Sequence, residues 1–208
     1  MKEEHFEQLE LEKLQQIIDQ IKQTDAGFNY EEFKKIVQYT GKLAIEMNSS
    51  FNEEELLRLQ SHASAHFFNR FLIDEPLRIP RNTHRFYDNA AVEEIYLDKI
   101  IPLSDHDEIK VVVIVRYNLL HRERINPVDF KDSSFEIKQK MELTYSRYRE
   151  QTAAEQESKE TLCEWCDSPI DVGDEWCSVC EHYVYVRYNV WMLHDKQFID
   201  YIYINKKA

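Results

Sequence analysis

The four cysteines of this chain are the residues whose type and spacing most clearly predict chemistry. Cys163 and Cys166 form one C-x-x-C pair, Cys177 and Cys180 form a second, and ten residues separate the two pairs. No cysteine lies elsewhere in the 208 residues. Two such pairs can bring four thiolates around one ion, and zinc takes four sulfur ligands at about 2.3 Å in tetrahedral geometry. The spacing therefore predicts a metal site that holds one zinc ion per chain.

A site made of four thiolates has no open coordination position for water or a substrate, so we expect a structural zinc rather than a catalytic one. Three alternatives stay open from the residues alone: two disulfides, a redox-active dithiol, and bound iron. Paired C-x-x-C spacing in a chain that begins without an apolar secretion signal favours a metal over these.

The segment between the two cysteine pairs is typical of a small zinc ribbon. Ser168-Pro169 and Val172-Gly173-Asp174 favour turns. Knuckles of this kind often carry glycine directly after the second cysteine, where the backbone takes a positive φ. Asp167 and Glu181 stand there instead, and aspartate tolerates a positive φ better than glutamate does.

The charge of the chain argues against a nucleic-acid partner. The formal net charge is −13, and the segment from residue 163 to 180 holds five acidic residues and no lysine or arginine. A module that binds phosphates needs the opposite sign.

Composition excludes several other classes of function. The chain has only three glycines, and it lacks the glycine-rich nucleotide-binding motifs and the G-x-S-x-G serine motif. Its longest aliphatic run, at residues 111–115, is far shorter than the roughly 20 residues of a membrane-spanning helix. We expect a cytoplasmic protein.

Three amphipathic helices are expected before residue 75. The first, within residues 1–24, carries an apolar stripe that fits equally well against the body of the protein or against a second copy. The second begins at a capping box formed by Asn29 and Glu32, and the third begins at Ser50 and Glu53. The apolar positions of these helices are Phe6, Leu9, Leu14, Ile17, Ile18 and Ile21 in the first, Phe33, Ile36, Val37, Thr40, Ala44 and Met47 in the second, and Leu56, Leu59, Ala63, Phe67, Phe68 and Phe71 in the third.

Strand patterns follow the helices. Residues 95–103 are extended up to Pro102, and residues 109–120 are almost continuously apolar, as in a central strand that is covered on both faces. Residues 135–145 alternate between apolar and polar, as in a strand with one face in water. Beyond Cys180, strand patterns resume at residues 183–191 and again at 198–204.

This order predicts an α+β fold in which N-terminal helices pack on a curved antiparallel sheet of four to six strands. The zinc ribbon is inserted between late strands. We divide the chain into an N-terminal amphipathic helix (1–24), an α+β cone-like domain (25–148 and 182–208), and an arm with the inserted zinc ribbon (149–181).

Several short motifs resemble a known family. Asp25-Ala-Gly-Phe28 with Glu31-Glu32-Phe33, the two cysteine pairs, and Trp191-Met-Leu193 are similar in order and spacing to bacterial relatives of the mitochondrial inner-membrane import-motor scaffold, translocase subunit forty-four. The resemblance covers residues 25–204. It implies a cone-shaped fold like that of nuclear transport factor two, and a protein-binding or peripheral-membrane role. The chain departs from the membrane-linked relatives in its strong negative charge.

Two functions follow as hypotheses. The first is a non-catalytic interaction scaffold that contacts a protein partner, with Trp165, Trp176 and Tyr183 as a candidate contact patch. Such a scaffold would associate with a membrane complex only indirectly, and it would pair with a second copy if the first helix is a pairing element. The alternative is an enzyme or a small-molecule-binding protein that uses the cone cavity. Its candidate residues are His62, His66, Asp98, His106 and Asp107.

Overall fold

The protein is described here from a computed structural model, which is α+β as the sequence predicts. The structure describes residues 2–48, 62–70, 83–126, 128–148, 163, 166–169, 177–180, 182 and 190–207. Its elements are α1 (Lys2–Thr24), α2 (Tyr30–Glu46), α4 (Ala65–Phe68), β1 (Thr83–Pro102), β2 (His106–Arg124), β3 (Phe130–Tyr148) and β4 (Met192–Lys207). The four strands form one antiparallel sheet in the order β1-β2-β3-β4.

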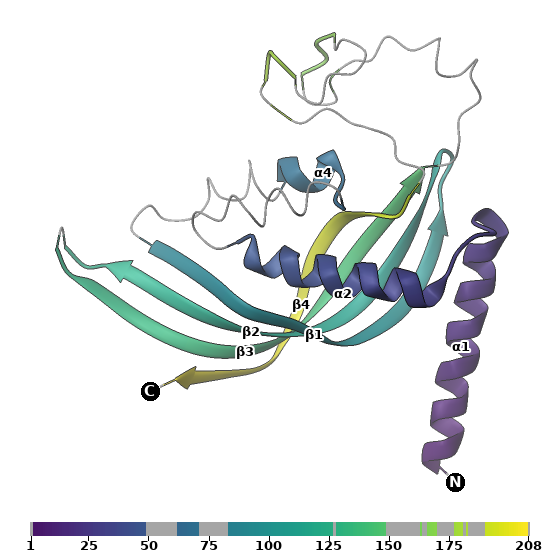
Figure 1. The fold of residues 1–208 in the computed structure, drawn as a ribbon, viewed down its shortest axis with the longest axis horizontal. Helices are drawn as coiled ribbons and strands as arrows, with labels where there is room; N and C mark the ends of the chain where they lie inside the picture. Colours follow the sequence, from purple (N-terminus) through teal and green to yellow (C-terminus); the bar gives the residue numbers. More distant parts are fainter. Residues whose placement is uncertain are drawn as a thin grey trace.

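The sheet is long and curved, and its curvature comes from the outer strands (Figure 1). Strands β2 and β3 pair without interruption from His106 opposite Tyr148 to Arg124 opposite Phe130. By contrast, the β1–β2 and β3–β4 pairs each contain three register shifts. An extra residue in one strand bends it and increases its twist, so these bulges curve both edges around a regular centre.

Strand β2 buries one face from Asp107 to Tyr117. Ile109, Val111, Val113 and Val115 are fully buried, whereas Val112 and Ile114 between them are only half-buried. The prediction that this strand is covered on both faces is therefore confirmed for the face toward α2 only. A run of β-branched residues does not reveal which of its members lie against a second layer.

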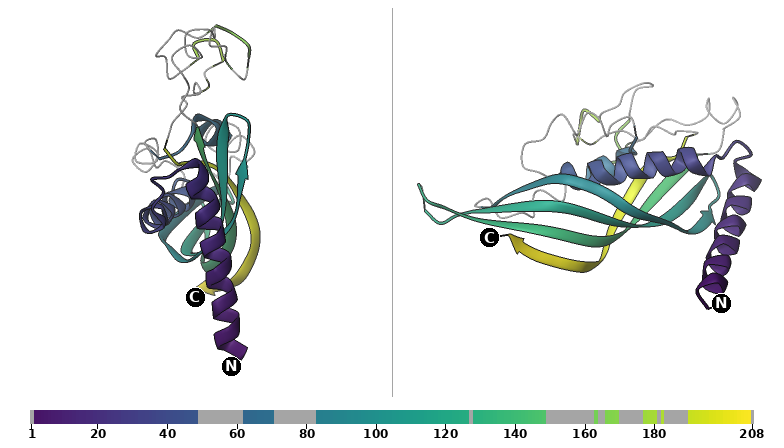
Figure 2. Two further views of the ribbon diagram at one scale, coloured as in Figure 1. Left: turned by 90° about the vertical axis from the view of Figure 1, so that its right-hand side faces the viewer. Right: turned by 60° about the horizontal axis from the view of Figure 1, so that its bottom comes forward.

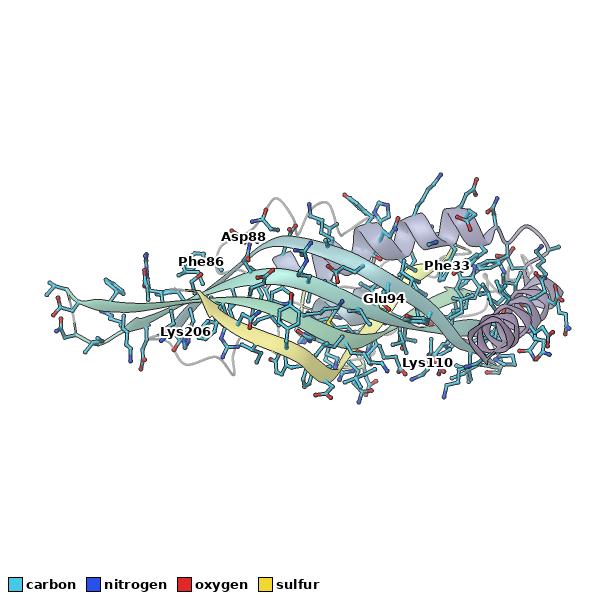
Figure 3. All side chains as sticks on the ribbon, turned by 90° about the horizontal axis from the view of Figure 1, so that it is seen from below. Phe33, Phe86, Asp88, Glu94, Lys110 and Lys206 are labelled. Atoms are coloured by element: carbon cyan, nitrogen blue, oxygen red, sulfur yellow. The ribbon has the colours of Figure 1, made fainter. Side chains whose placement is uncertain are left out.

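Cross-strand ion pairs line the other face of the sheet. Lys110 contacts Glu142 at 2.5 Å, and Glu93 accepts both Arg116 at 2.7 Å and Lys138 at 2.8 Å. Figure 3 shows the sheet from below, with Glu94 and Lys110 labelled. Opposite charges placed across strands stabilise the pairing and keep this face hydrated.

Strand β3 follows the predicted period of two. Its odd-numbered positions face α2, and Ile137, Met141, Leu143 and Tyr145 among them are buried. Gln139 lies on the same buried face, where its Oε1 accepts a hydrogen bond from the Tyr117 hydroxyl at 2.5 Å. A polar residue is tolerated there because its partner comes from the neighbouring strand.

Helix α2 lies in the curve of the sheet (Figure 1). Its N-cap is Asn29 as predicted, because the Asn29 Oδ1 accepts the amides of Glu31 and Glu32 at 3.0 and 3.3 Å. Phe33 packs edge-on against Tyr145 at 5.1 Å, and the hydroxyls of Thr40 and Tyr145 meet at 2.6 Å. The apolar face of α2 therefore docks across the sheet, with these side chains reaching β3 and the helix itself running closest to β1.

The C-terminal half of α1 packs on the body of the protein. Ile17, Ile18 and Ile21 are buried in the common core, and Leu14 packs against it, whereas Leu11 is 64% exposed. The N-terminal half of α1 extends past the end of the sheet (Figures 1 and 2). Most of the apolar stripe of α1 therefore packs against the body of the same chain. Pairing of this helix with a second copy stays a prediction. The side chains of Phe6 and Leu9 lie outside the described residues.

The third predicted helix falls largely outside the described residues. Its described part is α4, which buries Phe67 and Phe68 as expected. Ala63 does not belong to that helix, because it forms an isolated parallel bridge with Leu193. The predicted strand at residues 183–191 also lies outside the described residues, apart from Val190 and Trp191, which precede β4 and belong to no strand. The predicted segment 198–204 is part of β4.

No helix among the described residues combines the length and the apolar character needed to span a membrane.

The close approach of α2 to the sheet gives a first prediction. A Cβ atom added at Gly41 would lie 2.9 Å from Val92 Cγ2 and 3.4 Å from Leu143 Cδ1. Because valine is stiff, we expect Gly41→Ala to lower the free energy of unfolding by about 1–3 kcal/mol, despite the better helix propensity of alanine. Urea denaturation measures this change.

Gly27→Ala is the matched control, since its Cβ would meet only Asp25 Oδ1 at 3.7 Å. We expect it to leave stability unchanged or slightly raised. Equal effects of the two variants would contradict the packing of α2 described above.

Candidate metal centre

The four cysteines come together in the structure as their spacing predicts. Their Sγ atoms all lie within 4.8 Å of one another, with Cys163 to Cys180 at 3.5 Å and Cys166 to Cys177 at 3.7 Å. Four sulfur ligands about 2.3 Å from one tetrahedral ion lie about 3.8 Å apart, so these separations fit such a site. A disulfide needs an S–S distance of about 2.05 Å, and all four cysteines are free. The cluster could therefore hold one metal ion.

Two backbone turns with the same hydrogen bond position the sulfur atoms. The amide of Cys163 donates to the carbonyl of Ser168 at 2.9 Å, and that of Cys177 donates to the carbonyl of His182 at 2.8 Å. In both turns the acceptor lies five residues after the donor. Each C-x-x-C pair is thus carried by its own knuckle.

Asp167 shows why the first knuckle can form without glycine. Its φ is 56°, in the left-handed region, and its amide donates to the carbonyl of Cys163 at 2.9 Å. This agrees with the expectation from sequence, because aspartate tolerates that region better than most residues. The corresponding Glu181 lies outside the described residues.

Backbone amides aimed at sulfur favour the ionised thiol. Hydrogen bonds from the side chain and backbone of Ser168 lower the pKa of Cys166 to about 6. Backbone amides of Cys180 and Val179 also lower the pKa of Cys177. These donors would suit two of the cysteines to binding a metal, because the thiolate is the form that binds.

Cys180 has the opposite tendency. Burial, together with the hydrogen bonds to the three neighbouring cysteines, raises its pKa to about 12 against the lowering effect of the His182 amide. Four thiols this close cannot all ionise without a compensating cation. A divalent ion would remove that conflict, so the cluster is chemically suited to a metal.

Two of the four cysteines are shielded from solvent. Cys163 and Cys177 are 2% exposed, and Cys166 and Cys180 are half-buried against them. Among the residues that the structure describes, no other group of three or more histidine, cysteine, aspartate or glutamate side chains converges in this way.

Asp25 anchors both ends of the chain segment that carries the cysteines. The indole Nε1 of Trp191, just before β4, donates to Asp25 Oδ2 at 3.0 Å. Arg147, near the end of β3, lies 3.7 Å from Asp25 Oδ1 and donates to the carbonyl of Thr24 at 3.3 Å. The segment therefore leaves and rejoins the sheet beside one carboxylate. Sequence reasoning missed this contact, although Asp25 belonged to a motif that it singled out.

The five candidate residues for an enzyme do not form one site. His62 contacts Tyr39 with ring centroids 5.0 Å apart, whereas His66 stacks on His194 at 4.5 Å. The sequence placed His62 and His66 one turn apart on a helix. That placement is wrong, because α4 starts at Ala65 and His62 precedes the bridge at Ala63.

The remaining three candidates lie in different surroundings. Asp98 lines a pocket of about 190 Å³ between α1 and β1. His106 hydrogen-bonds Asp105 at 2.8 Å and stacks on Tyr148. Asp107 was expected in a solvated turn, but it is fully buried at the start of β2. The turn itself is confined to residues 104 and 105.

His194 is a residue that sequence reasoning missed. Its Nδ1 lies 3.2 Å from Ser64 Oγ, and its ring stacks on His66. Burial, followed by the positive charges of the neighbouring His66, His106 and Arg70, lowers its pKa to about 4. Only the β4 register brings these groups together, so no signal in the sequence could have identified them.

The predicted aromatic contact patch of Trp165, Trp176 and Tyr183 lies outside the described residues. Val179, at the tip of the second knuckle, is 66% exposed.

The positive φ at Asp167 gives a second prediction. We expect Asp167→Val to weaken zinc retention, because a β-branched residue is strained in the left-handed region by about 1–3 kcal/mol. Asp167→Gly should retain zinc at least as well as the parent, since glycine has no such penalty. Competition with a chromogenic chelator measures both. Equal retention by the valine and glycine variants would show that the knuckle does not need this backbone conformation.

The buried imidazole of His194 gives a third prediction. The unfolded chain protonates this residue near pH 6.5 and the folded chain near pH 4, so between these values the unfolded state binds more protons. The contribution of His194 to stability is therefore lost as the pH falls, by at most about 1.4 kcal/mol per pH unit. We expect the unfolding free energy to fall more steeply over this range in the parent than in His194→Gln.

Both proteins are measured with chelator present, so that metal release makes no contribution to the pH dependence. His84→Gln at the far end of the sheet is the control and should behave like the parent. Identical pH profiles for the parent and His194→Gln would contradict this assignment.

The chain was also compared with known proteins. No protein-family model, no curated protein and no solved structure matches it. The resemblance to the import-motor scaffold and its relatives therefore stays a prediction.

Proposed function

We propose that this protein is a non-catalytic interaction scaffold that carries one structural zinc ion, bound by Cys163, Cys166, Cys177 and Cys180. The observation that supports this proposal is the convergence of the four Sγ atoms within 4.8 Å on two matching knuckles. Four soft sulfur ligands in tetrahedral arrangement select zinc or iron among common metals. Zinc is the ion for which such paired knuckles are typical.

The zinc acts as a structural element because all four of its coordination positions are filled by the protein. Structural zinc sites in small domains contribute on the order of 10–16 kcal/mol of binding free energy at neutral pH. That is enough to fix the two knuckles relative to each other. The Asp25 contacts with Trp191 and Arg147 then hold the two ends of the cysteine-bearing segment at the sheet.

The interior next to α2 favours a scaffold over an enzyme. In the described part of the chain, aromatic side chains fill the space between α2 and the sheet. Phe28 and Phe33 contact each other at 5.3 Å and both contact Trp191, at 6.3 and 6.1 Å. Phe67 is fully buried in the same core.

We expect the partner to be a protein rather than a nucleic acid, because the chain carries a net charge of −13. Val179 supports this expectation, since a valine that is 66% exposed at a knuckle tip offers an apolar contact. A cytoplasmic location would suit the free thiols, which are kept reduced there. Any attachment to a membrane complex would run through the partner.

The pocket between α1 and β1 is the observation that favours the second candidate, a small-molecule-binding protein. It is lined mainly by apolar side chains of both elements, with Lys13 and Asp98 of opposite charge. At about 190 Å³ it is smaller than the roughly 300–1,000 Å³ of most ligand sites. Thermal stabilisation by a small apolar ligand, abolished by Leu14→Glu, would favour this function.

Native mass spectrometry before and after chelation tests the zinc site and is the fourth prediction. We expect one zinc per chain, lost in Cys177→Ser and retained in Ser178→Ala, which changes an exposed non-ligand of the same knuckle. Loss of one ligand should weaken zinc binding by at least about 100-fold. After chelation the far-ultraviolet circular dichroism should keep its strand signal, because the sheet core does not include the cysteines.

A chain that is free of metal, or lighter by about four daltons as two disulfides would make it, would contradict the proposal. Iron in place of zinc would keep the structural site but change its identity.

A further inference from the structure

Strand β4 exposes an apolar surface that none of the features above explains. Five large side chains in seven residues are about half exposed: Phe198 at 48%, Ile199 at 44%, Tyr201 at 47%, Ile202 at 47% and Ile204 at 50%. We call these five residues the β4 patch. The rings of Phe198 and Tyr201 contact each other at 4.6 Å, so these two side chains form one surface.

The patch lies at the free edge of the sheet. Strand β4 is the last strand in the order and pairs only with β3 among the described strands. Its C-terminal half lies away from α2 in Figures 1 and 2, and Figure 3 labels Lys206 near its end. Among the described helices, α4 contacts β4 at His194 and α2 contacts it at Lys196, both in the opposite half of the strand.

Two register shifts shape this edge. Phe198 pairs with Met141 and Asp200 with Lys140, so Ile199 is an extra residue. Tyr201 pairs with Gln139 and Tyr203 with Lys138, so Ile202 is extra as well. Bulges discourage a further strand from adding by backbone hydrogen bonds. The side chains of the patch, rather than its backbone, are therefore the surface available for contact.

From these observations we propose that the β4 patch is an isologous interface through which two copies of this chain associate. Between residues 197 and 205 the only charged side chain is Asp200, whereas the whole chain has a net charge of −13. Two copies repel each other across most faces. The β4 patch is where a second copy can approach without bringing rows of carboxylates together.

The chemistry of the patch also suits a contact with itself. In a two-fold interface the same surface is used by both subunits, so it must be complementary to itself, and apolar side chains meet that condition. A partner chosen by charge would instead bind the acidic surface. The inference is independent of the zinc site, since no cysteine contributes to it.

The size of the patch sets the expected strength. A Phe or Tyr side chain carries about 150–250 Å² of surface, so five half-exposed residues present roughly 400–500 Å². A stable interface takes about 800 Å² from each partner. The β4 patch supplies about half of this, and polar neighbours must supply the rest. We expect a dimer that dissociates at micromolar concentrations.

The fifth prediction is tested by sedimentation velocity. The full zinc-bound chain is measured between about 1 µM and about 300 µM. We expect dimers to form as the concentration rises, and added salt to strengthen them by screening the repulsion between copies. Ile202→Glu and Tyr201→Glu should each weaken the dimer at least about tenfold, because they place like charges opposite each other at the two-fold axis.

Leu11→Glu is the matched control, since Leu11 is 64% exposed but lies on α1. It should leave the dimer unchanged. Circular dichroism and zinc content check that each variant is folded, and Ile199→Glu replaces either variant that is not. Monomers at every concentration would overturn the proposal, as would a dimer that Leu11→Glu dissociates and Ile202→Glu does not. The measured zinc content separates either result from a failure of the metal site.

Discussion

Strands β3 and β4 are hydrogen-bonded neighbours, so the chain between Tyr148 and Met192 must begin and end at the same end of the sheet. Closing a loop of this length has an entropic cost that grows slowly with the number of residues. The structure meets this constraint at two levels. Asp25 holds the two ends of this segment through Arg147 and Trp191. Within the segment, the four cysteines bring residues 163 and 180 together. The Asp25 contacts lie directly beside the start of β4, whereas the cysteines form a cluster separate from the sheet core.

The register of β4 in turn places the groups at its start. The backbone of Leu193 exchanges hydrogen bonds with Ser64 and His62, and this contact docks the segment before α4 on the sheet. His194 is thereby buried beside Ser64 and His66. Lys196 reaches the carbonyl of Ala44 at 2.9 Å and Asn48 Oδ1 at 3.0 Å, where its positive charge complements the C-terminal end of α2. One strand thus organises a protonation-sensitive cluster and a helix end.

The distribution of charge divides the surface into regions with different uses. Ion pairs such as Lys110 with Glu142 neutralise the outer face of the sheet. Elsewhere the surplus of acidic residues keeps copies and anionic partners apart. The β4 patch and the exposed Val179 are apolar exceptions to this pattern. They lie on different parts of the fold, which would allow a dimer contact and a partner contact to coexist.

The sequence by itself determined the local features: the cluster of four cysteines through their C-x-x-C spacing, the N-cap Asn29, the α+β order of elements, and the buried face of β3 through its period of two. These are encoded by residues close together in the chain. The tertiary structure alone decided which contacts form between distant residues, such as Asp25 with Trp191 and His66 with His194. It also decided that Asp107 is buried and that β2 has one covered face. Strand pairing sets these contacts, and pairing depends on bulges that no local pattern marks.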